Sequence, residues 1–303
     1  MGVLLDSQSE IMVQGITGRE ASAMVQDMLD YGSRIVGGVT PGKGGQIVHG
    51  QPVYDTVAQL QRDHAATISV ISVPAPAVLD AALEAFDHGI KLCLIMSERV
   101  PRLDASRIML AASGCGCQVI GPNSLGLIRP HQAKLGTIGG RVDNVRRSFM
   151  PGSTAVLSRS GGMTTEIASF LTSHGIGQSI AIGIGGDPIV GANFSELIAL
   201  LETDSTTSSV VIYGEPGGTA EEDLARMLVQ CPSRLRINAF LSGRFVDDLQ
   251  GVRFGHAAVI VEQGRGSVQV KKEALRQAGV FVAERFDDLL EGLGPVSAVK
   301  ATD

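Results

Sequence analysis

The sequence contains no tryptophan, and aromatic residues make up only 4% of its 303 residues. Hydrophobic residues nevertheless reach 44% and there are 38 glycines, so we expect an aliphatic core and glycine-rich loops. Charged residues amount to 18%, and this balance excludes an intrinsically disordered chain. Because ordinary domains contain roughly 100 to 200 residues, the length predicts two domains. The composition is typical of an α/β protein.

Basic residues are also few. Lys and Arg total 25 against 31 Asp and Glu, which gives a net charge of −6 and a pI near 5.5. Nucleic-acid binding needs a basic surface, so this class of function is excluded. No apolar run approaches the roughly 20 residues that span a bilayer. Asp6 and Glu10 lie where a signal peptide needs basic and then apolar residues, so we expect a cytoplasmic protein.

Four cysteines are too few and too unevenly spaced to form a disulfide framework in a chain of this length. Cys115 and Cys117 form the only close pair, and neither a second pair nor a histidine cluster stands at zinc-ligand spacing. We therefore expect reduced, mostly buried thiols and no metal site.

Short β-branched runs alternate with helical periodicity along both halves of the chain. In the first half we expect strands at residues 11–14, 34–39, 68–73, 91–96 and 118–120, and helices at 19–31, 54–64, 77–88 and 104–113. In the second half we expect strands at 154–157, 179–182, 210–213, 236–240, 259–261 and 280–282, and helices at 162–174, 194–202, 220–230 and 268–278. Such alternation predicts parallel sheets.

The periodicity lapses between residues 121 and 152, where glycine and proline punctuate the chain. We therefore predict an α/β protein with two tandem doubly wound parallel-sheet domains. The first covers residues 1–127, a linker covers 128–151, and the second domain covers 152–303. In such sheets, ligands bind at the carboxyl ends of the strands.

The first glycine-rich turn, residues 14–21, follows the first expected strand and opens the first helix. Its glycines allow a tight turn, and the helix N-terminus favours an anion, although many such turns hold no ligand. An NAD site would want an acidic residue after the second strand. The sequence has Lys43 there and no carboxylate, which favours a phosphate-rich ligand over NAD.

A second anion-binding turn is predicted at residues 157–166, where a strand ends in small hydroxyl and glycine residues before a helix. The alternative is N-capping by Ser158 or Ser160, which needs no ligand. Residues 183–188 and 214–218 form further glycine loops at expected strand ends.

Of the six histidines, His256 alone lies between a glycine and an alanine, which leave the imidazole unobstructed. A lone histidine is usually structural. As a nucleophile it needs a carboxylate to fix its tautomer, and Glu215 at a strand end is a plausible partner.

Taken together, these segments resemble the α subunit of succinyl-CoA synthetase (succinate–CoA ligase), including malate–CoA ligase α-type subunits and the matching part of ATP-citrate lyase. The resemblance extends from Val13 to the final helix. Its most specific stretches are residues 36–45, 72–76, 121–123, 158–161, 183–188 and 255–257.

The resemblance implies a Rossmann-like CoA-binding domain followed by a flavodoxin-like ligase domain. It places CoA contacts at Thr17, Gly18, Arg19, Glu20, Lys43, Met96, Ser97 and Glu98. It places the phosphorylated histidine at His256, the carboxylate that orients it at Glu215, and phosphate- or substrate-binding residues at Asn123, Ser124, Ser158, Ser160, Gly161, Gly162 and Thr165.

The implied activity is an NTP-dependent acid–CoA ligase that works through phosphohistidine and an acyl phosphate. ATP or GTP with Mg²⁺ would be bound by a separate ATP-grasp β subunit, in a heterodimer or heterotetramer. No nucleic acid or membrane partner is implied.

Departures from the family pattern affect substrate choice most. Thr165 replaces the family's substrate-contacting Tyr, Ser124 replaces a Cys, and Arg99 introduces a charge beside the expected CoA channel. The acid need not be succinate. An alternative of another class is a non-catalytic CoA-binding or regulatory paralogue. The retention of His256 and Glu215 argues against this alternative. The hypothesis of an NAD-dependent oxidoreductase is supported by the first glycine-rich turn alone.

Overall fold

The computed structural model describes residues 4–243 and 266–293, and contacts between residues divide this part of the chain into two compact units. The first unit contains residues 4–145 and 183–192. The second contains residues 146–182, 193–243 and 266–293. The chain therefore leaves the second unit for one short segment. Among the helices described, none combines the length and hydropathy that a bilayer crossing needs.

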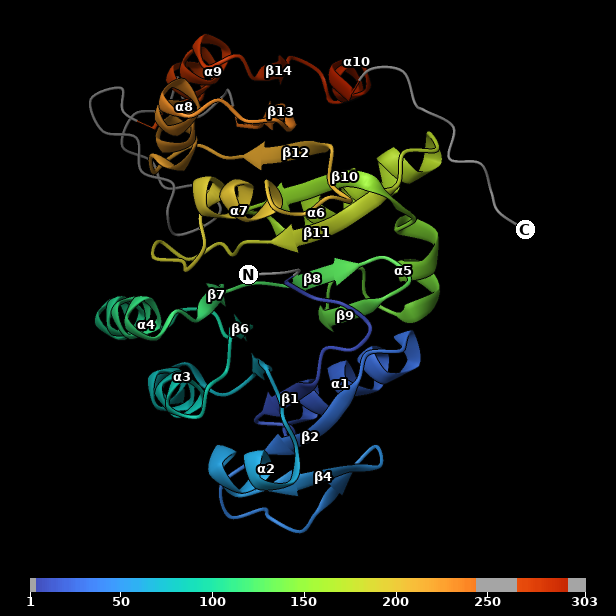
Figure 1. Cartoon of the computed structure of the whole chain (residues 1–303), viewed down its shortest axis with the longest axis vertical. Helices are drawn as coiled ribbons and strands as arrows, with labels where there is room; N and C mark the ends of the chain where they lie inside the picture. Colours follow the sequence, from blue (N-terminus) through green and yellow to red (C-terminus); the bar gives the residue numbers. More distant parts are fainter. Residues whose placement is uncertain (1–3, 244–265, 294–303) are drawn as a thin grey trace. The chain divides into compact units, whose positions relative to one another are not determined.

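Strands and helices alternate along the first unit (Figure 1). Its strands are β1 (Ile11–Gln14), β2 (Ile35–Val39), β3 (Ile47–Val48), β4 (Gln51–Tyr54), β5 (Ile68–Ile71), β6 (Leu92–Ile95), β7 (Gln118–Ile120), β8 (Gly126–Arg129) and β9 (Ala133–Gly136). Its helices are α1 (Arg19–Tyr31), α2 (Val57–Asp63), α3 (Val78–Asp87) and α4 (Arg102–Cys115), with a short 3₁₀ turn at Ala75–Ala77. Helix α5 (Val142–Ser148) begins near the end of the unit's long segment.

The first sheet has the strand order β3-β4-β2-β1-β5-β6-β7. All neighbours are parallel except β3 and β4, which form an antiparallel hairpin. Numbered along the chain, the parallel strands lie in the order 3-2-1-4-5-6, which is the Rossmann order. The order reverses between β1 and β5, so the loops that follow these two strands border the crevice where ligands bind.

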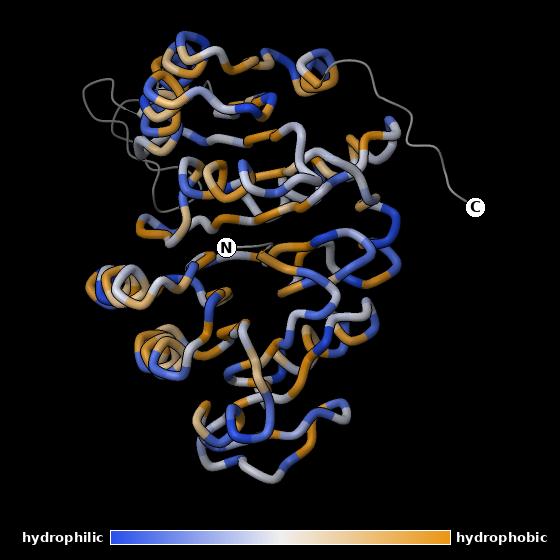
Figure 2. Tube along the Cα trace, in the orientation of Figure 1, coloured by the Kyte–Doolittle hydropathy of each residue, from blue (hydrophilic) through white to orange (hydrophobic). Residues whose placement is uncertain are grey.

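Helices α2, α3 and α4 bury their apolar sides against this sheet in one core cluster, which includes Met12, Leu60, Ala82, Ile95 and Ile108. Figure 2 shows hydrophobic and hydrophilic residues alternating along these helices, as expected when one side is buried. Helix α1 buries a separate apolar stripe and contacts the antiparallel β8–β9 hairpin. The helix ends at Gly32, whose left-handed backbone is favourable for glycine.

The second unit repeats the alternation. Its strands are β10 (Pro151–Ser158), β11 (Gln178–Gly183), β12 (Ser209–Gly214), β13 (Arg236–Leu241) and β14 (Phe281–Ala283). Its helices are α6 (Gly161–Ser173), α7 (Phe194–Leu201), α8 (Ala220–Gln230), α9 (Val268–Gln277) and α10 (Leu289–Leu293), with a 3₁₀ turn at Phe286–Asp288.

Among the strands described in this unit, the order is β14-β13-β12-β10-β11, and the pairs β10–β12, β12–β13 and β13–β14 are parallel. Numbered along the chain from the β11 edge, the order is 2-1-3-4-5, the flavodoxin order. The switch point lies between β10 and β12. The predicted fold class, two doubly wound α/β sheets in tandem, is confirmed.

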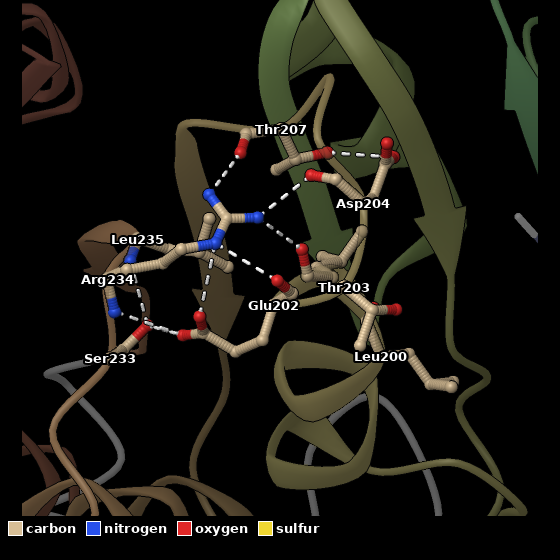
Figure 3. Close-up of polar contacts among 9 residues, drawn as sticks. Leu200, Glu202, Thr203, Asp204, Thr207, Ser233, Arg234 and Leu235 are labelled. Atoms are coloured by element: carbon tan, nitrogen blue, oxygen red, sulfur yellow. Dashed lines mark hydrogen bonds and ion pairs between the residues drawn. The ribbon is translucent and has the colours of Figure 1, made fainter. Parts of the chain in front are cut away.

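Arg234 ties the end of α7 to the start of the neighbouring strands in the second unit. Its guanidinium donates to the carbonyl oxygens of Leu201 (3.0 Å), Glu202 (3.0 Å), Asp204 (2.8 Å) and Thr207 (2.8 Å), and Figure 3 labels the last three of these acceptors. The last carbonyls of a helix have no intrahelical partner, so these bonds satisfy part of the α7 C-terminus.

Some expected elements differ from the observed ones, and one lies where no comparison is made. The helix expected at 54–64 is wrong at its start, because Tyr54 ends β4 and Thr56 caps α2 by accepting from the Gln59 amide. The segment 128–151, expected to be a linker, contains β9 and α5. The strand expected at 259–261 lies outside the described residues.

Candidate functional site

The turn between β1 and α1 lies at the switch point of the first sheet. Gly15 adopts φ +85°, and a Cβ built on it would come within 2.3 Å of the Ser72 carbonyl oxygen. Only glycine therefore fits where the loops after β1 and β5 touch. Gly18 occupies the N-cap of α1 without a side-chain cap, so the start of this helix is open to an anionic ligand.

Two clefts share the loops at this edge of the sheet. One, of about 700 Å³, is lined by Gly18, Arg19, Glu20, Met96, Ser97, Glu98, Asn123 and Ser124, among others. The other, of about 650 Å³, includes Thr17, Gly18, Thr40, Pro41, Asp80 and Glu84. Gly18 and residues 72–74 line both clefts, so the two are neighbouring parts of one binding surface. Sequence reasoning missed Thr40, Asp80 and Glu84.

Met96, Ser97 and Glu98 follow β6 and line the larger cleft together with residues of α1. The Ser97 hydroxyl donates to the Val73 carbonyl oxygen at 2.5 Å, which joins the loop after β6 to the loop after β5. Arg99, at φ +58°, points to Glu98 with 3.6 Å between Nε and Oε1, and both side chains are largely exposed. The charge introduced by Arg99 therefore lies against an acidic neighbour at the cleft.

Asn123 and Ser124 line the same cleft, but their polar groups are partly used by the fold. The Asn123 amide donates to Asp187 Oδ1 at 3.1 Å, and Asp187 belongs to the short segment that returns to the first unit. The buried Ser124 hydroxyl donates to the Gly183 carbonyl and accepts from the Gly126 amide at 2.9 Å. The single proton of the Ser124 hydroxyl is therefore committed to the backbone.

Lys43 lies on the exposed loop after β2 and is not among the residues that line either cleft. The loop is nevertheless ordered locally, since the Lys43 amide donates to Thr40 O at 3.0 Å and the Gly44 amide donates to Asp55 Oδ1 at 2.9 Å. Thr40 also contacts Thr17 through their hydroxyls at 3.3 Å. The loop that carries Lys43 thus begins at the cleft.

The start of α6 follows β10 at the switch point of the second sheet. Ser160 is the N-cap and accepts from the Met163 amide at 3.5 Å, so the predicted alternative of N-capping is observed. The buried Ser158 hydroxyl donates to Ser160 O at 2.7 Å. Gly161 and Gly162 form the first turn, and a Cβ on Gly162 would meet open space. Thr165 lies one turn further along α6.

Glu215 follows directly after β12, the strand beside β10. Register pairing places Ser158 opposite Tyr213, two residues before Glu215. The pKa of Tyr213 is raised above its usual value, mainly by burial. The hydrogen bond with the Ser242 hydroxyl at 2.5 Å lowers this pKa, and the nearby Glu215 charge raises it. A Cβ on Gly218 would lie 3.9 Å from Arg159 Nη1. The structure therefore brings the loop of Glu215 beside the loop that opens α6.

His256 lies outside the described residues, so its predicted pairing with Glu215 stays a prediction. Among residues 4–243 and 266–293, no cluster of three His, Cys, Asp or Glu side chains could hold a metal ion. Sequence reasoning also missed a buried pair behind Glu215, Lys271 and Glu221, whose members are separated by 50 positions. Glu221 lies in α8 and Lys271 in α9. Nothing in the sequence indicates their pairing beyond a charged residue on the apolar face of each helix.

Comparison with known families assigns both units. Residues 6–99 match the CoA binding domain family, and residues 157–281 match the CoA-ligase family. The first match contains the β1–α1 turn and the loop at residues 96–98. The second contains α6, Glu215 and the position of His256.

Similar proteins cover almost the whole chain. The succinate–CoA ligase [ADP-forming] subunit alpha 1 of Archaeoglobus fulgidus is 41% identical over 96% of this chain and 97% of that protein. An ADP-forming sulfoacetate-CoA ligase subunit of Bilophila wadsworthia is 40% identical over 94% of this chain and 96% of that protein.

A solved structure of ATP citrate lyase from Methanothrix soehngenii, in complex with citrate and coenzyme A, matches with a TM-score of 0.88 and 25% identity. The match covers 96% of this chain, which spans about half of that longer chain (50%). The predicted resemblance is confirmed. The chain belongs to the family of α subunits of ADP-forming acid–CoA ligases.

Proposed function

We propose that this chain is the CoA-binding and phosphoryl-carrying subunit of an ADP-forming ligase that joins a small carboxylic acid to CoA. The observation that carries the proposal is the pair of switch points. One has an open helix start above a large cleft, and the other has Glu215 beside the start of α6. In this proposal residues 1–127 form the CoA-binding domain, 128–151 link the two, and 152–303 form the ligase domain.

CoA fits the first of these sites. Its phosphates would lie beside Thr17 and Gly18 at the N-terminus of α1, where the amides of Arg19 and Glu20 would donate and the helix dipole favours an anion. Lys43 would reach the phosphates from its exposed loop. Met96, Ser97 and Glu98 would follow the pantetheine arm along the second part of the cleft. The two clefts together suit an extended ligand.

The phosphoryl-transfer steps belong to the second unit. The His256 imidazole attacks the terminal phosphorus of ATP and ADP leaves. The carboxylate of the acid then takes the phosphoryl group from the histidine and becomes an acyl phosphate. The CoA thiolate attacks its carbonyl carbon, and inorganic phosphate leaves. Glu215 would accept a hydrogen bond from the imidazole and fix its tautomer.

The start of α6 would stabilise the phosphoryl group between these transfers. The backbone amides of Gly161 and Gly162 and the helix dipole would stabilise its negative charge. Thr165 would face the acid from the same helix. Arg159 adds a cation near the loop of Glu215, since a Cβ on Gly218 would lie 3.9 Å from its guanidinium.

A partner subunit of the ATP-grasp type would bring ATP and Mg²⁺, which fits the naming of the relatives as α subunits. The relatives named above act on succinate and on sulfoacetate, both of which have an anionic group besides the carboxylate that is activated. We therefore propose a substrate acid with a second anionic group. We also propose a cytoplasmic location, which the four free cysteines support.

The test uses the chain co-expressed with its partner subunit. With γ-labelled ATP we expect an acid-labile label on the wild-type chain and none on His256→Asn, with CoA affinity unchanged. Glu215→Gln should lower the labelling rate by about 100-fold, a typical contribution of an orienting group. Unlabelled wild-type protein that still binds CoA would instead identify a non-catalytic paralogue.

The acid is tested with the same complex by following CoA consumption. Succinate, malate and sulfoacetate should support turnover, while propionate, which lacks a second anionic group, should not. Equal turnover with propionate would contradict the proposed substrate class.

A further inference from the structure

The second unit contains an ion pair that is almost completely buried. Lys271 on α9 and Glu221 on α8 are each 1% exposed, and Nζ lies 2.5 Å from Oε2. The same ammonium donates to Gly217 O at 2.6 Å and to Glu215 O at 2.8 Å. An ammonium has three donors, so all three of its protons are used, and two of them bind the loop that follows β12.

This loop needs external ties to hold one conformation. Gly217 and Gly218 both have positive φ, at +83° and +64°, and glycine has more backbone freedom than any other residue. The Gly217 amide also donates to Gly266 O at 2.8 Å. Within the described residues, the Lys271 side chain and the bond to Gly266 therefore both hold the loop that carries Glu215.

Stability alone does not account for the buried pair. Helices α8 and α9 already bury apolar residues, including Leu224, Leu228 and Leu275. Replacing a buried ion pair by apolar residues is often neutral for stability. Within the described residues Glu221 Oε1 is buried without a hydrogen-bond partner, and a Cβ on Gly214 would come within 2.5 Å of it. The carboxylate thus lies directly against the end of β12. Its burial there costs free energy of desolvation that the fold does not require.

We propose that Lys271 is a positioning residue that fixes the Glu215 loop for phosphoryl transfer. It acts through the backbone carbonyls of Glu215 and Gly217, and the Glu221 carboxylate holds the ammonium in place. This inference rests on the proposed function, since it assigns a purpose to the position of Glu215. Because the CoA clefts are lined by residues of the first unit, loss of Lys271 should slow phosphorylation without changing CoA affinity.

The test compares three variants. Lys271→Met leaves Glu221 buried and unpaired, so this variant is expected to fold poorly. Lys271→Met with Glu221→Met removes both charges and both loop bonds while keeping apolar volume. Lys272→Met is the matched control, because Lys272 is the next residue of α9, is also buried, and pairs with Glu284 at 2.8 Å.

In the complex with the partner subunit, the double variant should be labelled by γ-labelled ATP at least tenfold more slowly than wild type. Its Kd for CoA should stay within twofold, and its melting temperature should stay close to that of wild type. Lys272→Met should be labelled within twofold of the wild-type rate. A double variant that is labelled at the wild-type rate, or an equal loss in Lys272→Met, would overturn the proposal.

Hydrogen exchange separates this inference from the proposed function. The Gly217 amide should exchange at least tenfold faster in the double variant than in wild type or in Lys272→Met. Faster exchange in a chain that is never labelled would refute the phosphoryl-transfer function and leave the loop tie standing. Unchanged exchange would refute the tie itself, whatever the activity.

Discussion

Gly15 is a residue where one methyl group decides whether two loops can meet. The chain turns at φ +85° there, and an added Cβ would come within 2.3 Å of the Ser72 carbonyl oxygen. We expect Gly15→Ala to lower the free energy of unfolding by about 3 kcal/mol, because backbone strain and a clash with backbone act together. Urea denaturation measures the loss, and calorimetric titration with CoA should show weaker binding.

Gly42→Ala is the matched control. Gly42 has a similar φ of +74°, but an added Cβ would meet nothing within 4 Å. It should cost only about 1 kcal/mol, the penalty of a left-handed conformation for alanine. An equal loss in both variants would show that the contact with Ser72 does not matter.

At the same scale, local chemistry could be predicted and distant pairings could not. The sequence predicts that Ser160 can cap α6, because a hydroxyl before a helical run accepts from an amide three residues later. The bond between Asn123 and Asp187 joins residues 64 positions apart. No local pattern indicates it, since it depends on where the chain returns in space.

Arg234 gives a prediction at the scale of elements. Its guanidinium binds four backbone carbonyls from the end of α7 to the approach of β12 (Figure 3). We expect Arg234→Ala to lower the free energy of unfolding by about 2 kcal/mol, because hydrogen bonds from a charged donor are lost together. Arg234→Lys should restore little, since one ammonium cannot reach all four acceptors.

The control for Arg234 is Arg226, an exposed residue that pairs with Asp223 within α8. Arg226→Ala should change the free energy of unfolding by less than about 0.5 kcal/mol, as is usual for surface ion pairs. Chemical denaturation of both variants checks the difference, and a comparable loss in Arg226→Ala would contradict the special role of Arg234.

Elements with a strong apolar period were predicted well, and elements defined by a turn were not. Helices α1 and α8 begin and end where the period predicts, because each buries one apolar stripe. The β3–β4 hairpin was missed. Its turn residues His49 and Gly50 have φ of +49° and +79°, as in a tight hairpin turn, but lack the Asn-Gly or Asp-Gly signal.

For the whole molecule, ligand choice gives the clearest test. CoA at about 100 times its Kd should stabilise the chain by about 2.7 kcal/mol. This corresponds to roughly 5 to 10 °C in the melting transition of the unit that binds it. NAD at the same concentration should shift it little, because Lys43 and no carboxylate follows β2. Thermal denaturation measures both, and an equal or larger shift with NAD would contradict the assignment of the first cleft.

The strand alternation also predicted the two-sheet plan, but not how the chain divides between the units. Residues 183–192 continue from β11 without a break in sequence, yet their contacts belong to the first unit. The Gly121 amide donates to Ile184 O at 2.9 Å, and the Gly191 amide donates back to Gly121 O at 2.8 Å. Periodicity does not indicate a segment that crosses from one unit to another.

This crossing has a practical consequence for anyone who wishes to study the halves separately. A fragment that stops at residue 145 would lack the peptide that β7 and the Gly-Pro-Asn turn bind, leaving Gly121 and Val119 without the partners they have in the intact chain. Protein engineering that separates CoA binding from phosphoryl transfer therefore requires two cuts and a rejoined peptide.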